Sequence, residues 1–355
     1  MNPIMQTIGL DLGSRYSVFC ACDASLAGDL WRGRVRTTRD KMERFFRSQP
    51  RSLVVIEVGQ VSPWVSRLAE EAGHEVVVAN PRMLPMIYQD ARKSDDRDAE
   101  HLMRLGRFDP KLLSPIQHRR EETQMALGLF RARDALVGAR TKLVNTVRSL
   151  AKSHGVQIRK TAAKCFEKKA REDLTPELLD MLGSVVDTIE GLSRRILSYD
   201  KRINELGEKQ YPETALLMQV TGVGMLTALA FRLTVEDLSR LSKNRSAGAY
   251  FGLTARRDQS GSQDRELGIT KQGDPFVRRL LVQSAQYILG HYGKDSDLRR
   301  WGLALVARGG KAAKKRAVVA VARKLAVLLL ALWRSGEVYE PLRNAKVCEP
   351  EIAGV

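Results

Sequence analysis

The stretch Leu53-Val54-Val55-Ile56-Glu57-Val58 is an apolar run that contains a single acid, Glu57. Such a run is typical of a central strand that is covered on both faces of its sheet. Two shorter apolar or β-branched runs precede it, at residues 7–10 and 17–22, and Gly13-Ser14-Arg15 between them fits a hairpin turn. We therefore expect the first part of the chain to form a sheet around residues 53–58.

The elements on either side of this run give the order of the fold. A third strand is expected at residues 30–35, a helix at 38–47 and a fifth strand at 74–79. Ser62 and Pro63 are typical of a helix start, and Asn80-Pro81 is expected to begin another helix. The order βββαβαβα is that of an RNase H-like α/β domain, in which a short meander is followed by right-handed crossovers.

Four acids fall where such a sheet would bring them together. Asp11 closes the first strand and Glu57 closes the central one, while Asp95 and Asp98 share one face of a helix that begins near Ser94. Carboxylates packed closely repel one another unless a cation neutralises them. Oxygen ligands without a nearby His or Cys suit Mg²⁺ or Mn²⁺, and two such ions would serve a phosphodiester displacement.

From about residue 121 the apolar spacing alternates between four and three. The two runs are Met125, Leu129, Ala132, Leu136, Ala139, Leu143, Thr146 and Leu150, then Leu182, Val185, Ile189, Leu192, Ile196, Tyr199, Ile203 and Leu206. This pattern predicts a coiled coil, within the chain or between protomers, with core helices of one globular domain as the alternative. The basic residues 152–171 between the runs are expected to form a poorly ordered loop that orders on nucleic acid. The chain beyond about residue 211 is expected to be mainly helical.

The composition indicates a polyanionic partner. Lys and Arg number 59 against 41 Asp and Glu, which gives a net charge of +18. Aromatic residues make up only 6% of the chain, so contacts with a duplex backbone are expected to exceed base stacking. The four cysteines fit neither a disulfide framework nor a zinc site, and no signal peptide or membrane span is predicted. We expect a cytoplasmic, nucleoid-associated protein without a membrane partner.

Several spaced motifs resemble one known family. They are Gly9-Leu10-Asp11, Val55-Ile56-Glu57, the K-[ST]-D-x-x-D-A pattern of Lys93-Ser94-Asp95-Asp96-Arg97-Asp98-Ala99, Gly222-Val223-Gly224, Tyr250-Phe251-Gly252-Leu253, Gln259-Ser260-Gly261 and Gly268-Ile269-Thr270-Lys271-Gln272-Gly273. Together they resemble the DEDD-type serine transposases of insertion sequences, which are related to the Piv-type DNA invertases. The resemblance covers nearly the whole chain.

This resemblance implies an architecture and a reaction. It implies a RuvC-like domain over residues 1–115, a coiled coil with a basic insert over 116–212, a helical transposase domain over 213–345 and a tail over 346–355. Asp11, Glu57, Asp95 and Asp98 would bind the metal, and Ser260 would be the nucleophile that forms a covalent phosphoserine link to DNA. The implied partners are donor and target duplex DNA, a guide (bridge) RNA, and further copies of the chain in a dimer or tetramer, with the site formed in one chain or between two.

The chain departs from the family pattern around the serine. Gln259 stands where a serine is common, Ser262 where a glycine is common, and Ala255 where proline is frequent. Ser262 therefore remains an alternative nucleophile to Ser260, and a polar turn remains the structural alternative for both.

Basic residues and glycines mark the expected nucleic-acid contacts. Gly222 and Gly224 open a helix whose backbone N–H groups would face a phosphate. The other expected contacts come from the motifs and the neighbourhood of the serine, and they are Lys93, Arg256, Arg257, Lys271, Arg278 and Arg279.

Three other functions are compatible with parts of the sequence. A RuvC-like structure-specific nuclease would use the four acids without rejoining DNA. An actin-like ATPase would use Ile8-Gly9-Leu10-Asp11-Leu12-Gly13-Ser14 as a phosphate loop, but it gives the pair Asp95 and Asp98 no role. A non-enzymatic nucleic-acid-binding protein would leave the acids without a purpose.

Overall fold

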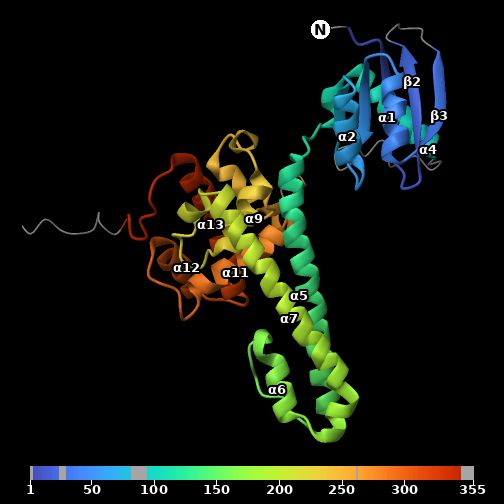
Figure 1. The fold of residues 1–355 in the computed structure, drawn as a ribbon. Coiled ribbons are helices and arrows are strands. Elements are labelled where there is room, and N and C mark those ends of the chain that lie inside the picture. Colours follow the sequence, from blue (N-terminus) through green and yellow to red (C-terminus); the bar gives the residue numbers. More distant parts are fainter. Residues whose placement is uncertain (1–2, 24–28, 81–93, 261–262, 345–355) are drawn as a thin grey trace, which may run out of the picture. The chain divides into compact units, whose positions relative to one another are not determined.

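The structure, a computed structural model, describes residues 3–23, 29–80, 94–260 and 263–344 (Figure 1). The chain divides into two compact units, Met1–Arg120 and Glu121–Val355. Each unit is described by itself below. Lys93, Ser262, the expected helix start at Asn80-Pro81 and the expected tail over 346–355 fall wholly or partly outside the described residues.

The first unit is built on a five-stranded mixed sheet. Its strands are β1 (Gln6–Asp11), β2 (Tyr16–Asp23), β3 (Leu30–Arg36), β4 (Ser52–Glu57) and β5 (Glu75–Ala79). They lie in the order β3-β2-β1-β4-β5. The first three strands form an antiparallel meander, and β4 and β5 run parallel to β1. The predicted α/β sheet is therefore confirmed, with β1 at its centre and β4 as the neighbouring interior strand.

Helices cover both faces of this sheet. Helices α1 (Arg39–Ser48) and α2 (Ser62–Glu71) bury Phe46 and Val65 against Ile8 and Ile56 on one face. Helix α4 (Asp95–Phe108) covers the other face, where Ala99 and Met103 pack on Cys20 and Cys22. No disulfide joins the described cysteines Cys20, Cys22 and Cys165.

Two glycines bring α4 unusually close to the strands. A Cβ atom at Gly9 would lie 2.1 Å from the carbonyl oxygen of Ala99, and one at Gly106 would lie 2.3 Å from Val55 Cγ2. Only a residue without a side chain allows so close an approach, to backbone at Gly9 and to the Val55 side chain at Gly106. Because Gly9 and Val55 are partners on neighbouring strands, α4 crosses from β1 towards β4 as the helix proceeds.

One expected helix start differs in detail. Val61 is the N-cap of α2, and Ser62 is the first helical residue. The Ser62 hydroxyl donates to the carbonyl of Gly59 and accepts from its N–H, both at 2.9 Å. Ser62 therefore closes the turn before the helix, and Pro63 still lies in the first turn, where a missing N–H costs nothing.

The second unit begins with two long paired helices, α5 (Glu121–Ser153) and α7 (Pro176–Gln210), which lie side by side in Figure 1. The run predicted on α7 is confirmed as the packed face at its main positions, since Leu182, Ile189, Leu192, Ile196 and Ile203 are buried. The pairing occurs within the chain.

The run predicted on α5 is wrong in phase at both ends. Met125 is 72% exposed and Leu150 39% exposed. The buried residues of α5 are Thr123, Ala126, Leu127, Phe130, Val147 and Ala151. The physical reason is that the buried face lies one position later in the same period and includes basic side chains: Arg133 Nε donates to Asp200 of α7 at 2.5 Å, and Arg140 Nη1 donates to Ser193 of α7 at 3.3 Å. A pattern of apolar residues alone does not register such positions.

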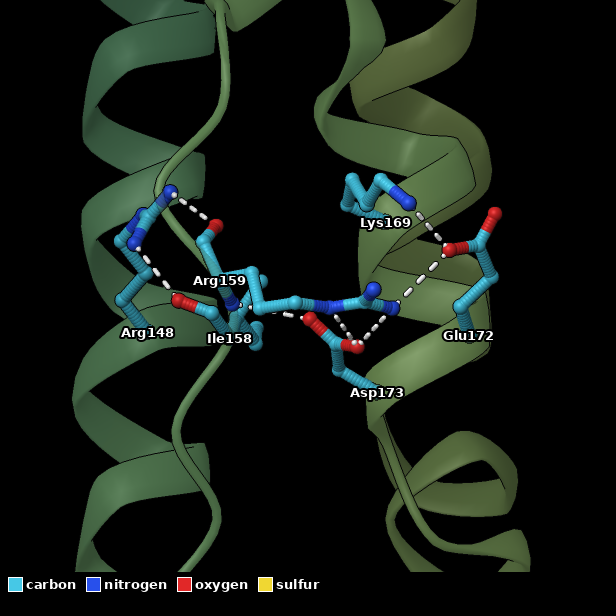
Figure 2. A network of polar contacts seen from close by, with 6 residues as sticks. All are labelled: Arg148, Ile158, Arg159, Lys169, Glu172 and Asp173. Atoms are coloured by element: carbon cyan, nitrogen blue, oxygen red, sulfur yellow. Dashed lines mark hydrogen bonds and ion pairs between the residues drawn. The ribbon is translucent and has the colours of Figure 1, made fainter.

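The basic segment between the long helices is ordered, which corrects the expectation of a poorly ordered loop. It contains η3 (Ala163–Cys165) and α6 (Phe166–Asp173), and Phe166 and Ala170 are buried against the ends of α5 and α7. Acids pair with two of its cations, Arg159 and Lys169, and Arg148 of α5 binds its backbone (Figure 2). Arg159 Nε donates to Asp173 at 2.7 Å, Lys169 pairs with Glu172 at 2.5 Å, and Arg148 Nη1 donates to the carbonyl of Ile158 at 3.1 Å.

The remainder of the unit is mainly helical, as expected. Its elements are α8 (Thr214–Leu217), α9 (Met225–Val235), η4 (Leu238–Arg240), η5 (Asn244–Ser246), α10 (Ala247–Tyr250), α11 (Pro275–Leu289), α12 (Asp297–Ala307) and α13 (Ala313–Ser335). Helix α13 supplies the centre of the core, where Val321, Leu325 and Leu329 are fully buried. No helix among the described residues is both long enough and apolar enough to cross a bilayer.

A two-stranded antiparallel hairpin interrupts these helices. It consists of β6 (Ala255–Ser260) and β7 (Gln263–Ile269), with Ser260 opposite Gln263. The sequence did not predict this hairpin, because Ala255-Arg256-Arg257-Asp258-Gln259-Ser260 lacks the alternation of apolar and polar residues that indicates a strand.

Candidate active site

Two of the four predicted acids end neighbouring parallel strands. Asp11 is the last residue of β1 and Glu57 the last residue of β4, directly after the paired residues Leu10 and Ile56. Both acids are half-buried. The carboxyl ends of parallel strands share one edge of a sheet, and functional groups commonly gather there. This edge is therefore the candidate active site in the first unit.

The other two acids lie in the first turn of α4. Ser94 is the N-cap, and the Asp98 N–H donates to the Ser94 carbonyl at 3.0 Å. Asp95 is exposed and Asp98 half-buried. Acids are favourable at a helix N-terminus because the helix dipole is positive there. Since Ala99, the residue after Asp98, packs on Gly9 of β1, the close glycine contact brings this turn towards the strand that carries Asp11.

A hollow of about 610 Å³ lies beside these elements. It is lined by Val18, Arg32, Gly33, Arg34, Ser94, Asp95 and Asp96. Val18 is the partner of both Asp11 and Arg34 in the sheet. The hollow therefore borders the row of the sheet that contains Asp11, and it combines acids with two arginines.

The donor chemistry fits a divalent metal, but a metal cage is not assembled in the described residues. No three His, Cys, Asp or Glu side chains in the described part of the chain lie close enough together to hold a metal ion. The four predicted acids thus come from three elements that meet at one end of the unit, without forming a compact group there. Carboxylate oxygens remain the ligands that Mg²⁺ prefers.

One acid beside this hollow was not found from the sequence. Glu100 of α4 pairs with Arg32 of β3 at 2.6 Å and with Arg104 at 2.7 Å. The hydrogen bond from Arg32 holds the pKa of the Glu100 carboxyl below its usual value, so this acid is ionised. The pair joins two elements that are 68 residues apart, which no local pattern indicates.

The predicted nucleophile belongs to the second unit. Ser260 is the last residue of β6, and Arg256 and Arg257 are exposed on the same strand. Lys271, which follows β7, is exposed and has a left-handed backbone with φ 56°. The strand that ends at the candidate serine therefore carries two of the predicted cations exposed, while Lys271 lies beyond the other end of the hairpin.

The two remaining predicted arginines are engaged within the protein. Arg278 Nη1 donates to the carbonyls of Phe251 and Gln272, at 3.1 and 2.9 Å. Arg279 pairs with Asp134 of α5 and lies 5.2 Å from the ring of Phe276. These contacts give Arg278 a structural role at the base of the hairpin and Arg279 a structural role between α11 and α5.

The two predicted glycines open a helix, as expected. Gly224 is the N-cap of α9, and Gly222 has φ +86°, a backbone conformation that favours glycine. A Cβ atom at Gly222 would lie 3.1 Å from the Ser284 carbonyl. A hollow of about 620 Å³ adjoins both glycines and also includes Tyr287 and Lys294.

Two protein families match the chain, and the first match extends from the first unit through α5 of the second. Residues 8–155 match the DEDD family of the IS110 type, described as "Transposase", and residues 214–298 match "Transposase IS116/IS110/IS902 family". The first match includes all four acids, and the second includes Ser260 and both glycines. The chain is therefore an enzyme of the transposase class, which cleaves and rejoins DNA. Within that class it belongs to the IS110/IS116 family of transposases.

Individual relatives agree with the family matches. The chain is 28% identical over 259 residues to the transposase for insertion sequence element IS1111A of Coxiella burnetii, covering 71% of this chain and 70% of that protein. It is 28% identical over 311 residues to a "Probable family 20 transposase" of Pseudomonas aeruginosa, covering 85% and 90%. It is 26% identical over 289 residues to the transposase for insertion sequence element IS1328 of Yersinia enterocolitica, covering 80% and 84%.

The DEDD family match also indicates dependence on a divalent metal. The match also favours a transposase over an actin-like ATPase, the alternative with which residues 8–14 were compatible.

Proposed function

We propose that this transposase joins DNA through two groups: a divalent metal held by Asp11, Glu57, Asp95 and Asp98, and the hydroxyl of Ser260. The observation that carries the proposal is the placement of Asp11 and Glu57 at the ends of adjacent parallel strands, with the acidic first turn of α4 brought towards them by Gly9. In this proposal the first unit is an RNase H-like, RuvC-like domain.

The strand order supports that fold assignment. A three-stranded meander followed by two parallel strands reproduces the βββαβαβα order expected from the sequence. Mg²⁺, or Mn²⁺, would neutralise the carboxylates and stabilise charge on the phosphate oxygens. The residues that would hold it are the four acids of the first unit.

Ser260 would form the covalent intermediate. Its Oγ attacks phosphorus, an Oγ–P bond forms, and the bond from phosphorus to one deoxyribose oxygen breaks. The serine proton ends on that departing oxygen, so the phosphoserine ester retains the energy of a phosphodiester. A deoxyribose hydroxyl of a second strand then attacks the ester, which releases the serine and completes rejoining.

The proposed partners are donor and target duplex DNA, a guide (bridge) RNA and further copies of the chain. The net charge of +18 supports a polyanionic partner. Exposed apolar side chains on the long helices, Met125, Met181 and Leu197, support dimers or tetramers through the α5–α7 pair. The guide RNA and the nucleoid location rest on the resemblance and the charge.

A covalent adduct on a defined peptide tests the serine. Wild-type protein is incubated with Mg²⁺, RNA transcribed from the element and DNA carrying the element ends, then denatured and digested with trypsin. We expect a nucleotide adduct on the peptide of residues 258–265, which fragmentation assigns to Ser260 rather than Ser262. Ser260→Ala should abolish the adduct and Ser262→Ala should retain it.

Two other outcomes would reject Ser260 as the nucleophile. An adduct that persists in Ser260→Ala and disappears in Ser262→Ala would transfer the role to Ser262. Cleavage that continues in Ser260→Ala without any adduct would identify a metal-dependent nuclease that does not rejoin DNA.

A further inference from the structure

A groove of about 1160 Å³ lies in the second unit. It lies between the base of the β6–β7 hairpin and helices α12 and α13, and we call it the α12–α13 groove. Its apolar lining includes Leu267 of β7, Trp301 and Leu305 of α12, and Val319 and Val327 of α13.

The groove carries an uncompensated positive charge. Six cations line it and no acid does; the cations are Arg245, Arg308, Lys315, Arg316, Arg323 and Lys324. Within the described residues none of the six forms an ion pair, in contrast to Arg159 and Lys169 of the α6 segment. Cations that crowd one hollow without acids repel one another, and a bound polyanion would relieve that repulsion.

The apolar lining indicates which kind of polyanion fits. Trp301 is half-buried in the groove wall, with the Lys324 ammonium 4.4 Å from its ring centroid, and Leu267 is 43% exposed. Duplex DNA offers phosphates but hides the faces of its bases. An unpaired strand offers both phosphates for the cations and base faces for an indole and aliphatic side chains.

The position of the groove relates it to the candidate serine. Ala255, the first residue of β6, and Ile269, the last of β7, both line the groove. Ser260 is five residues beyond Ala255 on the same strand, which corresponds to about 17 Å at the rise of a β-strand. A strand held in the groove therefore lies near the hairpin that carries Ser260.

We propose that the α12–α13 groove binds single-stranded DNA next to the cleavage site, with its phosphates on the six cations and its bases against Trp301, Leu305 and Leu267. The commitment to DNA rests on the proposed function, because Ser260 acts on a DNA strand there. The groove would hold the strand that separates from its complement when Ser260 takes the phosphate.

Fluorescence anisotropy measures the proposed binding without requiring cleavage. Full-length protein is titrated, in EDTA, with a labelled 12-nucleotide DNA strand, the same sequence as a duplex and the same sequence as RNA. The test variant is Lys315→Gln/Arg316→Gln, and the matched control is Lys311→Gln/Lys314→Gln, which removes the same charge from exposed residues that do not line the groove.

We expect the groove variant to bind the single DNA strand about tenfold more weakly at 0.1 M salt. The slope of log affinity against log salt should fall by about 1.4, because each lost phosphate contact to a single strand contributes about 0.7. The control should lose less than threefold. Equal losses in both variants would overturn the proposal, as would a loss confined to the duplex or to RNA.

Tryptophan fluorescence provides a second, independent readout. An oligothymidylate should quench part of the wild-type emission, and Trp301→Phe should remove that part, while Leu267→Gln should weaken single-strand binding about threefold without altering the circular dichroism spectrum. Unchanged quenching in Trp301→Phe would overturn the stacking of bases in the groove. If the wild-type protein forms no Ser260 adduct but still binds the single strand in the groove, the proposed function is rejected and the groove remains a single-strand site.

Discussion

At the scale of single residues, the first turn of α4 contains a matched pair of acids. Asp96 and Asp98 lie two positions apart at the same helix N-terminus, so both gain a similar benefit from the helix dipole. They differ in exposure, because Asp96 is exposed and Asp98 half-buried. Only Asp98 belongs to the predicted metal-binding set.

Comparing variants of Asp96 and Asp98 therefore separates a role in metal binding from a role in stabilising the helix start. We expect Asp98→Asn to reduce Mg²⁺-dependent adduct formation by at least 100-fold, because a neutral amide binds a divalent cation far less well than a carboxylate. Asp96→Asn should retain activity within about threefold. Thermal melting should change by a similar small amount in both variants, since each loses one charge worth about 0.3–1 kcal/mol at the helix start. Similar activities for the two variants would remove Asp98 from the metal-binding set.

Residue-level prediction succeeded where chemistry and local pattern coincide. Asp11 and Glu57 were expected at strand ends and occur there, and Gly224 was expected to open a helix and does. The contacts that confine Arg278 and Arg279 were not predictable, because Asp134 and the Phe251 carbonyl come from other elements. A basic residue that neighbours a functional motif in sequence can still be used to hold the fold together.

At the scale of elements, the α6 segment (residues 158–173) is held together internally by ion pairs as well as by packing: Arg159 pairs with Asp173, and Lys169 with Glu172. The hydrogen bond from Arg159 holds the pKa of Asp173 below its usual value, and Lys169 does the same for Glu172. A carboxyl whose pKa is lower in the folded state stabilises that state at pH values above its unfolded pKa, about 4. This stabilisation is lost as the pH falls from about 4 through the lowered folded value.

The α6 segment should therefore loosen in acid. We expect backbone hydrogen exchange over residues 158–173 to accelerate below about pH 4 relative to the rest of the α5–α7 pair, after correction for the intrinsic pH dependence of exchange. Asp173→Asn should give faster exchange already at pH 7 and a weaker acid response. Asp180→Asn, an exposed position on α7 that forms no ion pair in the described residues, is the control and should behave as wild type. A wild-type response in Asp173→Asn would contradict this explanation.

The two long helices show what an apolar period can and cannot predict. On α7 the seam from Leu182 to Ile203 was predicted correctly, since one partner, α5, accompanies most of that face. On α5 the same reasoning placed exposed Met125 and Leu150 in the seam, because the packed face lies one position later and includes Arg133 and Arg140, which an apolar pattern does not register. The β6–β7 hairpin was missed for another reason: its strands are mostly polar and exposed, so they carry no alternating signal.

At the scale of the whole molecule, the division at Arg120 separates the four acids from Ser260. The sheet of the first unit has its own core around Ile8, Phe46 and Ile56, and the helices of the second unit have another around α13. The sequence indicated both kinds of architecture. It could not indicate the α12–α13 groove, whose lining residues come from several elements between Arg245 and Val327.

Separate fragments test whether each unit folds by itself and whether Ser260 needs the acids of the first unit. We expect residues 1–120 and 121–355, expressed separately, each to melt cooperatively, because each contains a complete core. The fragment 121–355 should bind single-stranded DNA within about threefold of the full chain, since the whole groove belongs to it. It should form no serine adduct without the acids. An adduct formed by fragment 121–355 alone would show that Ser260 needs no help from the first unit.

The close contacts at Gly9 of β1 and Gly106 of α4 determine how the acidic turn responds to solution conditions. At Gly9 and Gly106 the helix rests directly on the sheet, and the restraint there is steric rather than electrostatic. Steric contacts are not screened by ions, whereas contacts between charges are. The placement of Asp95 and Asp98 relative to β1 should therefore be indifferent to ionic strength, even though every encounter of this basic protein with a polyanion weakens as salt rises. The salt concentration then changes the affinity of the protein for DNA, while the positions of Asp95 and Asp98 relative to β1 stay constant.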